Sequence, residues 1–244
     1  CLLSRGLGDV YKRQILDKTK LVNSVFSKVH KKYDLMNDIM SFGIHRVWKE
    51  KFIDWLNPFP ESKLIDVASG TGDIAKLFSK RNNNSSEITC IEPNGKMFEE
   101  GKKNLKEFIN IKWLKAHAEK LPVKDNSYDY YSISYGIRNV SDINKTLREA
   151  YRVLKPGGRF MCLEFSKIDN EILNFLYQQY SKAIPLVGKY VVGTAEPYEY
   201  LVRSINQFYT QDELLKLMSK NGFSNTEHRN LSNGVSAIHS GWKI

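Results

Sequence analysis

The chain has 244 residues, and 41% of them are hydrophobic, which excludes wholesale disorder and suits a single α/β domain. Its 37 Lys and Arg outnumber its 27 Asp and Glu, so the formal net charge is +10. That charge favours an anionic partner such as a membrane surface, a nucleic acid or an anionic metabolite, unless it belongs to an ordinary solvated surface.

The three cysteines lack CxxC spacing, so they indicate neither a zinc site nor a redox dithiol, and we expect no metal. No apolar run reaches the roughly 18 residues that a membrane-spanning helix needs. Residues 1–14 contain no Met, break their apolar run with Arg5 and are not typical of a signal peptide. We expect them to be a non-native or disordered leader, and we expect residues 15–244 to form one domain.

Helical spacing dominates residues 15–58, and two prolines then end it before the first strand. Five segments rich in β-forming residues follow and alternate with helical patterns. This alternation predicts a mostly parallel sheet that is covered by helices on both faces. The predicted strands are residues 63–69, 87–92, 111–116, 128–135 and 159–166. The clearest intervening helices are residues 73–80 and 143–154, and residues 155–158 (KPGG) are predicted to end the latter and turn the chain.

The aromatic-rich residues 167–209 show no strand–helix alternation, and we predict an inserted helical cap there. Thr210 and Glu213 form a capping box that begins another helix, and Gly222 ends it. Two further strands, residues 225–231 and 234–242, predict a β-hairpin at one edge. The fold class is therefore a doubly wound α/β sheet of seven strands with N-terminal helices and a helical insert.

The strongest local signal is a buried strand that leads into a glycine turn and then a helix, over residues 64–73. In a doubly wound sheet this turn borders the ligand crevice, and Gly70 and Gly72 let the backbone approach a ligand closely. The next strand ends at Glu92, where a carboxylate can accept hydrogen bonds from both hydroxyls of a ribose. The pattern therefore predicts a nucleoside site.

Residues 70–75 also fit the G-x-G-x-x-G/A pattern of dinucleotide sites, so the glycines alone leave that alternative open. A pyrophosphate needs a helix N-terminus without acids, whereas this loop carries Asp66 and Asp73. Two carboxylates suit a nucleoside with an ammonium and a sulphonium group, which is S-adenosylmethionine. Asp73 is alternatively an ordinary N-terminal helix acid that is favourable with the helix dipole.

Two more segments fit the same ligand. His117 and Ala118 follow the third predicted strand, where the adenine edge would lie. The loop that begins at Ser134 follows the fourth strand and would face the transferable methyl group.

Together these residues resemble the ubiquinone/menaquinone biosynthesis C-methyltransferases, from about Val25 to the C-terminus. Residues 66–73 and 154–158 are shared with many methyltransferases. The segments that are specific to this family are YDLMND at 33–38, MSFGIHRVW at 40–48, YGIRNV at 135–140, LREAYR at 147–152, LEFS at 163–166, YLVRSI at 200–205 and AIHSG at 237–241.

The resemblance implies that residues 15–244 are an S-adenosylmethionine-dependent methyltransferase domain that acts without a metal. Its substrate would be the ring carbon of a reduced prenylated quinone, either 2-methoxy-6-polyprenyl-1,4-benzoquinol or demethylmenaquinol. The cofactor positions that it implies, together with those of the glycine loop, are Asp66, Gly70, Thr71, Gly72, Glu92, His117, Ala118 and Ser134. Three positions depart from the family pattern: Ser69 replaces a glycine, Glu92 an Asp, and His117 an Asn or Asp.

Methylation of a ring carbon needs a deprotonated quinol hydroxyl, so the site must stabilise a phenolate and accept a proton. We expect Arg138 to stabilise the phenolate, unless it forms a structural ion pair with Asp142 or Glu164. His45 and Tyr33 are the candidates for proton transfer, and each has a purely structural role as its alternative.

The apolar side chains of the cap would cover a prenyl tail, or would form an ordinary helical core. Because such a tail lies in the bilayer, we expect a cytoplasmic protein that associates peripherally with the inner face of the membrane, aided by its positive charge. Further expected partners are other quinone-biosynthesis enzymes and a second copy in a homodimer. The alternatives are a methyltransferase for another small phenol, a sterol or RNA, and a basic nucleic-acid binder. Scattered basic residues and the lack of an RNA-binding motif argue against nucleic acid.

Overall fold

The computed structural model describes residues 18–28, 35, 37–38, 41, 43–168, 177, 179–180 and 195–244. The predictions for the leader at 1–14, for Tyr33 and for most of the cap at 167–209 therefore lie outside the described residues. The described end of the cap contains a helix, α8 (Glu196–Asn206).

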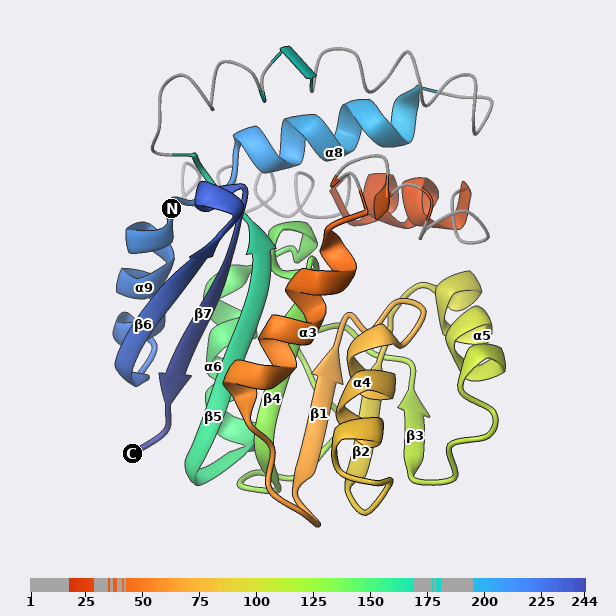
Figure 1. Ribbon diagram of the computed structural model, residues 1–244, viewed down its shortest axis with the longest axis vertical. Helices are drawn as coiled ribbons and strands as arrows, with labels where there is room; N and C mark the ends of the chain where they lie inside the picture. Colours follow the sequence, from red (N-terminus) through yellow and green to blue (C-terminus); the bar gives the residue numbers. More distant parts are fainter. Residues whose placement is uncertain are drawn as a thin grey trace, which may run out of the picture.

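Within the described residues, seven strands form one sheet in the order β3-β2-β1-β4-β5-β7-β6 (Figure 1). Strands β1 to β5 run parallel, β7 runs antiparallel to β5, and β6 runs antiparallel to β7. The predicted doubly wound sheet with a hairpin at its edge is confirmed. The strands are β1 (Lys63–Val67), β2 (Glu87–Ile91), β3 (Ile111–Leu114), β4 (Tyr128–Ser134), β5 (Leu154–Phe165), β6 (Ser224–Leu231) and β7 (Ser236–Trp242).

Helices cover both faces of the sheet, so its central strands β1, β4 and β5 are largely buried on both sides. In β1, Leu64 packs into the core formed with α3 and α4, whereas the next residue, Ile65, packs into the core formed with α6 and α9. The remaining described helices are α3 (His45–Leu56), α4 (Asp73–Arg81), α5 (Gly95–Asn104), the short η2 (Ile137–Asn139), α6 (Ile143–Val153), α9 (Gln211–Lys220) and the short η3 (Ser232–Gly234). Residues 18–28 are also helical.

Helix α9 begins with the predicted capping box, in which Thr210 and Glu213 exchange hydrogen bonds. Helix α5, in contrast, is not among the elements that the hydrophobic pattern predicts. Its start is fixed by Asn94, whose side-chain oxygen accepts hydrogen bonds at 3.1 Å from the backbone N–H groups of Lys96 and Met97.

Helix α6 ends at Val153, close to the predicted end, but residues 155–158 are not a separate turn before the strand. Strand β5 already begins at Leu154, which pairs with Tyr128, and the next pairing joins Tyr130 to Arg159. The intervening residues thus form a bulge inside β5. Two hydrogen bonds hold this bulge, from Gly157 N to the Lys243 carbonyl (2.7 Å) and from Lys243 N to the Gly158 carbonyl (3.0 Å).

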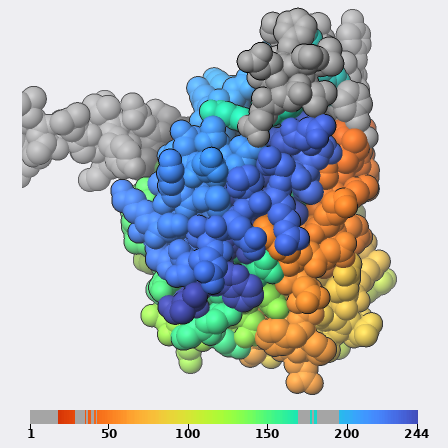
Figure 2. Space-filling model, turned by 60° about the vertical axis from the view of Figure 1, so that its left-hand side comes forward, coloured from red at the N-terminus to blue at the C-terminus, as the bar shows by residue number. Residues whose placement is uncertain are grey.

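Helix α3 packs beside the C-terminal hairpin of the sheet, and Figure 2 shows it (orange) directly beside the C-terminal segments (blue). The indole N–H of Trp48 donates to the Ser232 hydroxyl at 3.0 Å. Near the other end of α3, the Arg229 guanidinium lies 4.0 Å from the ring of Trp55. No helix among the described residues is both long and apolar enough to cross a bilayer.

The glycine turn is packed tightly against α5, and Gly101 is the residue that permits this contact. A Cβ on Gly101 would lie 2.9 Å from the Gly70 carbonyl oxygen and closer still to the Trp113 ring. We expect Gly101→Ala to lower the free energy of unfolding by about 1–3 kcal/mol, because neither the backbone nor the indole can move cheaply. Urea unfolding measures the difference.

The matched control lies on the same helix. A Cβ on Gly95 would meet only the flexible end of Lys115, with its Nζ at 3.2 Å. Gly95→Ala should therefore stay within about 0.5 kcal/mol of the parent. Equal stability of the two variants would contradict the tight packing of α5 on the glycine turn.

Candidate active site

The candidate site lies at the carboxyl end of β1, where the strand order reverses between β2 and β4. Backbone strain marks the two loops that leave the sheet here. Ala68 follows β1 and Tyr135 follows β4, and each has a φ of +54°, which is uncommon for residues with a side chain. Residues 18–28 and α8 lie over this end of the sheet (Figure 1).

Glu92 is buried just beyond β2, and its carboxylate is held from two sides. One oxygen accepts a hydrogen bond from Gly70 N (2.9 Å), and the other accepts one from Asn94 N (2.8 Å). Burial raises the pKa of Glu92 to about 7, although these two hydrogen bonds act in the opposite direction. The carboxylate is thus fixed in orientation at the position that the sequence assigns to ribose recognition.

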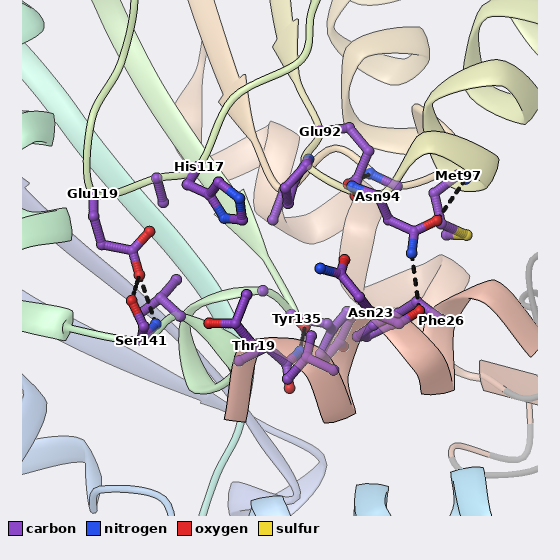
Figure 3. Close-up of a pocket in the computed structure, with 18 residues that line it drawn as sticks. Thr19, Asn23, Phe26, Glu92, Asn94, Met97, His117, Glu119, Tyr135 and Ser141 are labelled. Atoms are coloured by element: carbon purple, nitrogen blue, oxygen red, sulfur yellow. Dashed lines mark hydrogen bonds between the residues drawn. The ribbon is translucent and has the colours of Figure 1, made fainter. Parts of the chain in front are cut away.

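A first cavity extends from Glu92 towards the loop after β3, where His117 and Ala118 line it as predicted. Figure 3 shows His117, Glu92 and Met97 on one side of this cavity and Thr19, Asn23 and Phe26 on the other. The opposite wall therefore comes from residues 18–28.

Asn94 joins the two walls of the first cavity. Its side-chain N–H group donates to the Asn23 carbonyl (3.1 Å) and to the Ser27 hydroxyl (3.0 Å). Sequence reasoning missed this wall because helical spacing indicates a helix without saying where it packs. The polar Asn94 directly after Glu92 and Pro93 is the signal that could have identified the cap of α5.

A second cavity adjoins the first and shares Ala68, Gly70 and Tyr135 with it. The predicted residues Thr71 and Ser134 line it. Its remaining lining residues are Lys49, Asp66, Ser69, Asp73 and Ile74.

Asp66 is the buried acid of this second cavity. One of its oxygens accepts a hydrogen bond from the Ser132 hydroxyl at 2.6 Å. The other, Oδ2, is buried and has no hydrogen-bond partner among the described residues. Burial raises the pKa of Asp66 to about 7. An unsatisfied buried carboxylate oxygen of this kind is suited to receive a cationic group of a ligand.

Gly72 and Asp73 stand apart from the other residues of the glycine loop. Gly72 lines neither cavity; it precedes α4 with a φ of +90°, and a Cβ there would lie 2.5 Å from Leu105. Asp73 begins α4 and lines the second cavity, but Lys49 Nζ contacts its Oδ2 at 2.5 Å. Part of the negative charge that favours a cationic cofactor is therefore compensated by a lysine that the sequence analysis did not single out.

Arg138 lies in η2 and is buried. Its Nη1 donates to the Glu164 carboxylate (2.5 Å) and to the Tyr135 carbonyl (2.7 Å), so the ion pair with Glu164 is the one that forms. Asp142 instead caps α6. Arg138 lines a third cavity of about 680 Å³, together with Lys18, Tyr200 and Arg203, rather than either of the first two.

His45 lines none of these three cavities. It is buried at the start of α3, and its Nε2 lies 3.0 Å from an Asp38 oxygen. Burial, with the nearby charge of Lys49, lowers the pKa of His45. Tyr33 lies outside the described residues. Among the residues that the structure describes, no cluster of His, Cys, Asp and Glu could hold a metal ion.

Comparison with known proteins identifies close relatives of the chain. The model of the ubiE/COQ5 methyltransferase family matches residues 13–243. A ubiquinone/menaquinone biosynthesis C-methyltransferase of Rickettsia bellii (strain OSU 85-389) is 51% identical over 235 residues, which cover 93% of this chain and 94% of the relative. The protein of the same name from Brucella abortus (strain S19) is 46% identical over 234 residues, which cover 93% of this chain and 87% of the relative.

Solved structures share the fold at lower identity. A methyltransferase of Thermotoga maritima, described as S-adenosylmethionine-dependent, has a TM-score of 0.66 and 22% identity, covering 91% of this chain and 100% of its own. A second S-adenosylmethionine-dependent methyltransferase, from Aquifex aeolicus, has a TM-score of 0.60 and 16% identity, covering 80% and 89%. These likenesses bear on the fold alone.

The raised pKa values of Asp66 and Glu92 predict that cofactor binding depends on pH. An acid must lose its proton before it attracts an ammonium group or accepts two hydroxyl hydrogen bonds, and both carboxyls have a pKa of about 7. We expect the affinity for S-adenosylhomocysteine to rise between pH 6 and pH 8, by up to about tenfold per pH unit for each carboxyl that must ionise. Isothermal titration calorimetry at pH 6, 7 and 8 measures it.

Asp66→Asn is the control for this pH dependence. It removes one ionisation, so it should bind more weakly at pH 8 and show a shallower pH profile than the parent. A parent affinity that is flat across this range would contradict the assignment of these carboxyls to the cofactor.

Proposed function

Because the chain belongs to the ubiE/COQ5 methyltransferase family, we propose that it transfers the methyl group of S-adenosylmethionine to a ring carbon of a reduced prenylated quinone. The substrate is 2-methoxy-6-polyprenyl-1,4-benzoquinol or demethylmenaquinol. The observation that carries this proposal is the 51% identity, over 93% of the chain, with a relative named for ubiquinone and menaquinone biosynthesis.

The residues that line the two adjoining cavities match the groups of the cofactor. Glu92 supplies a fixed carboxylate for the ribose hydroxyls, and His117 and Ala118 border the space for adenine. Oδ2 of Asp66, which has no hydrogen-bond partner among the described residues, suits the amino group at the amino-acid end of the cofactor. When bound, S-adenosylmethionine supplies an electrophilic methyl group.

Arg138 is the residue that we assign to the phenolate. Carbon is a weak nucleophile until the neighbouring hydroxyl loses its proton, and a nearby guanidinium favours the oxyanion that results. Glu164 and the Tyr135 carbonyl hold this guanidinium at the wall of the third cavity, whose volume of about 680 Å³ suits a small molecule. A fixed cation needs no reorganisation when the charge develops.

The reaction also needs a base that removes the proton from the methylated ring carbon, and His45 and Tyr33 are the candidates. His45 is held by Asp38 and lines none of the three cavities, which favours a positioning role over direct proton transfer. Tyr33 remains a candidate from the sequence.

The prenyl tail of the substrate places the reaction at a membrane. We propose that the protein works from the cytoplasm at the inner face of the membrane, where its net charge of +10 favours anionic lipid headgroups. Other quinone-biosynthesis enzymes and a second copy of the chain are the further partners that we propose.

Methyl transfer tests the proposed function directly. Labelled S-adenosylmethionine is incubated with a short-tailed 2-methoxybenzoquinol and, separately, with demethylmenaquinol, each under reducing conditions. We expect the label on a ring carbon of at least one quinol and none on bulk RNA in a parallel reaction. Label on RNA, with none on either quinol, would favour the RNA alternative and overturn the proposal.

The role of Arg138 can be separated from its ion pair. Arg138→Lys keeps the charge but loses the planar fork, so kcat should fall by about tenfold or more. Arg138→Met leaves the fully buried Glu164 without its cation and should lower the free energy of unfolding by about 3–5 kcal/mol. Methyl-transfer rates and urea unfolding measure the two effects.

The double variant Arg138→Met/Glu164→Gln distinguishes catalysis from stability. It removes both charges while the glutamine oxygen can still accept the hydrogen bond that Phe165 N donates at 2.9 Å. We expect it to recover most of the lost stability and none of the lost activity. Recovery of activity would show that Arg138 serves only the fold.

A further inference from the structure

Lys49 is a buried lysine that the proposed function leaves without a role. Only 5% of its surface is exposed, although lysine is almost never buried unless it is paired. It lies one helical turn after His45, on the same side of α3 as Phe52 and Leu56, which are core residues. A charge on the apolar side of a helix carries a desolvation cost, so it needs a local reason.

The surroundings of Lys49 belong to the second cavity. Its Nζ contacts Asp73 at 2.5 Å, and both residues line that cavity together with Asp66. Asp73 is 37% exposed in its side chain, so it is less buried than its partner, whose side chain is 7% exposed. Among the described residues that line the second cavity, Lys49 is the one with a cationic side chain.

The amino-acid end of S-adenosylmethionine carries an ammonium and a carboxylate. Asp66, with its buried and unpartnered Oδ2, matches the ammonium. The carboxylate needs a cation in the same cavity, since an anion beside Asp66 and Asp73 would otherwise be repelled. Lys49 can supply this cation while its contact with Asp73 holds the ammonium group of the lysine at the cavity wall.

We propose that Lys49 binds the carboxylate of the cofactor's amino-acid end, that Asp73 positions Lys49, and that Lys49 and Asp66 together make the second cavity selective for a zwitterion. The inference rests on the proposed function only for the identity of the cofactor. It predicts which adenosine derivatives bind. Derivatives that lack the carboxylate lose the contact with Lys49, and derivatives that lack the whole amino-acid end lose the contacts with both residues.

Three ligands with an uncharged sulphur separate these contacts. S-adenosylhomocysteine has both charged groups, S-adenosyl-3-thiopropylamine keeps only the amine, and 5′-methylthioadenosine has neither. Calorimetric titrations with each ligand are made on the full chain and on Lys49→Met, Asp66→Asn and Lys51→Met. Lys51 is an exposed lysine of the same helix and is the matched control.

Lys49→Met should weaken the binding of S-adenosylhomocysteine by about 10- to 100-fold, which is the usual effect of losing one charge-assisted hydrogen bond. It should leave the binding of 5′-methylthioadenosine unchanged and should not weaken the binding of the amine, because it removes a cation from a cavity that would hold an ammonium group. Asp66→Asn should weaken the binding of S-adenosylhomocysteine and of the amine, but not the binding of 5′-methylthioadenosine. Lys51→Met should change none of the three affinities.

Unchanged binding of 5′-methylthioadenosine shows that the Lys49→Met protein is folded around its adenosine cavity. Equal weakening of all three ligands would overturn the proposal, because it would mean that Lys49 only joins α3 to α4. Undiminished binding of S-adenosylhomocysteine would also overturn it. No quinol is present in these titrations, so a result against the role of Lys49 can be distinguished from a result against quinol methylation.

Discussion

The carboxylate of Glu92 is the contact on which the rest of the site depends. Its hydrogen bonds to Gly70 N and Asn94 N tie the glycine loop after β1 to the segment that begins α5. Asn94 in turn caps α5 and donates to Asn23 and Ser27, which holds residues 18–28 over the cavity. One buried acid therefore links the two sides of the first cavity, and it is also the group that we propose for the ribose.

A buried acid of this kind destabilises the folded protein when it is ionised. Burial raises the pKa of Asp66 from 3.8 to about 7 and that of Glu92 from 4.5 to about 7. The pKa of each carboxyl is therefore higher in the folded protein than in the unfolded chain. The protonated carboxyl contributes to folding stability in full below about pH 4, and this contribution is lost as the pH rises through 7. At neutral pH, a ligand that brings a cation and hydroxyl donors offsets part of this cost, so cofactor binding and folding stability are linked through the same two groups.

Local sequence patterns are sufficient for most of the sheet, because strand alternation, the glycine turn, the Thr210 capping box and the C-terminal hairpin are short-range features. They also place Glu92, His117 and Ala118 at the ends of predicted strands, and parallel strands end at one edge. What they cannot supply is contact between distant elements. The choice between Asp142 and Glu164 as partner of Arg138 depends on how η2 lies beside β5, and the burial of Lys49 depends on which way α3 faces.

The glycine loop itself argues against a dinucleotide for a reason that charge alone does not give. A pyrophosphate binds by accepting hydrogen bonds from backbone N–H groups at a helix N-terminus. Here Ser69 N already donates to the Ile91 carbonyl (3.1 Å), Gly70 N to Glu92 (2.9 Å) and Gly72 N to the Ser69 carbonyl (2.9 Å). Lys49 compensates Asp73, so repulsion by that acid is weaker than the sequence suggests. These three loop donors are occupied, whereas Asp66 Oδ2 is a buried acceptor without a hydrogen-bond partner among the described residues. These contacts support our proposal that the loop faces a ligand that donates hydrogen bonds and carries positive charge.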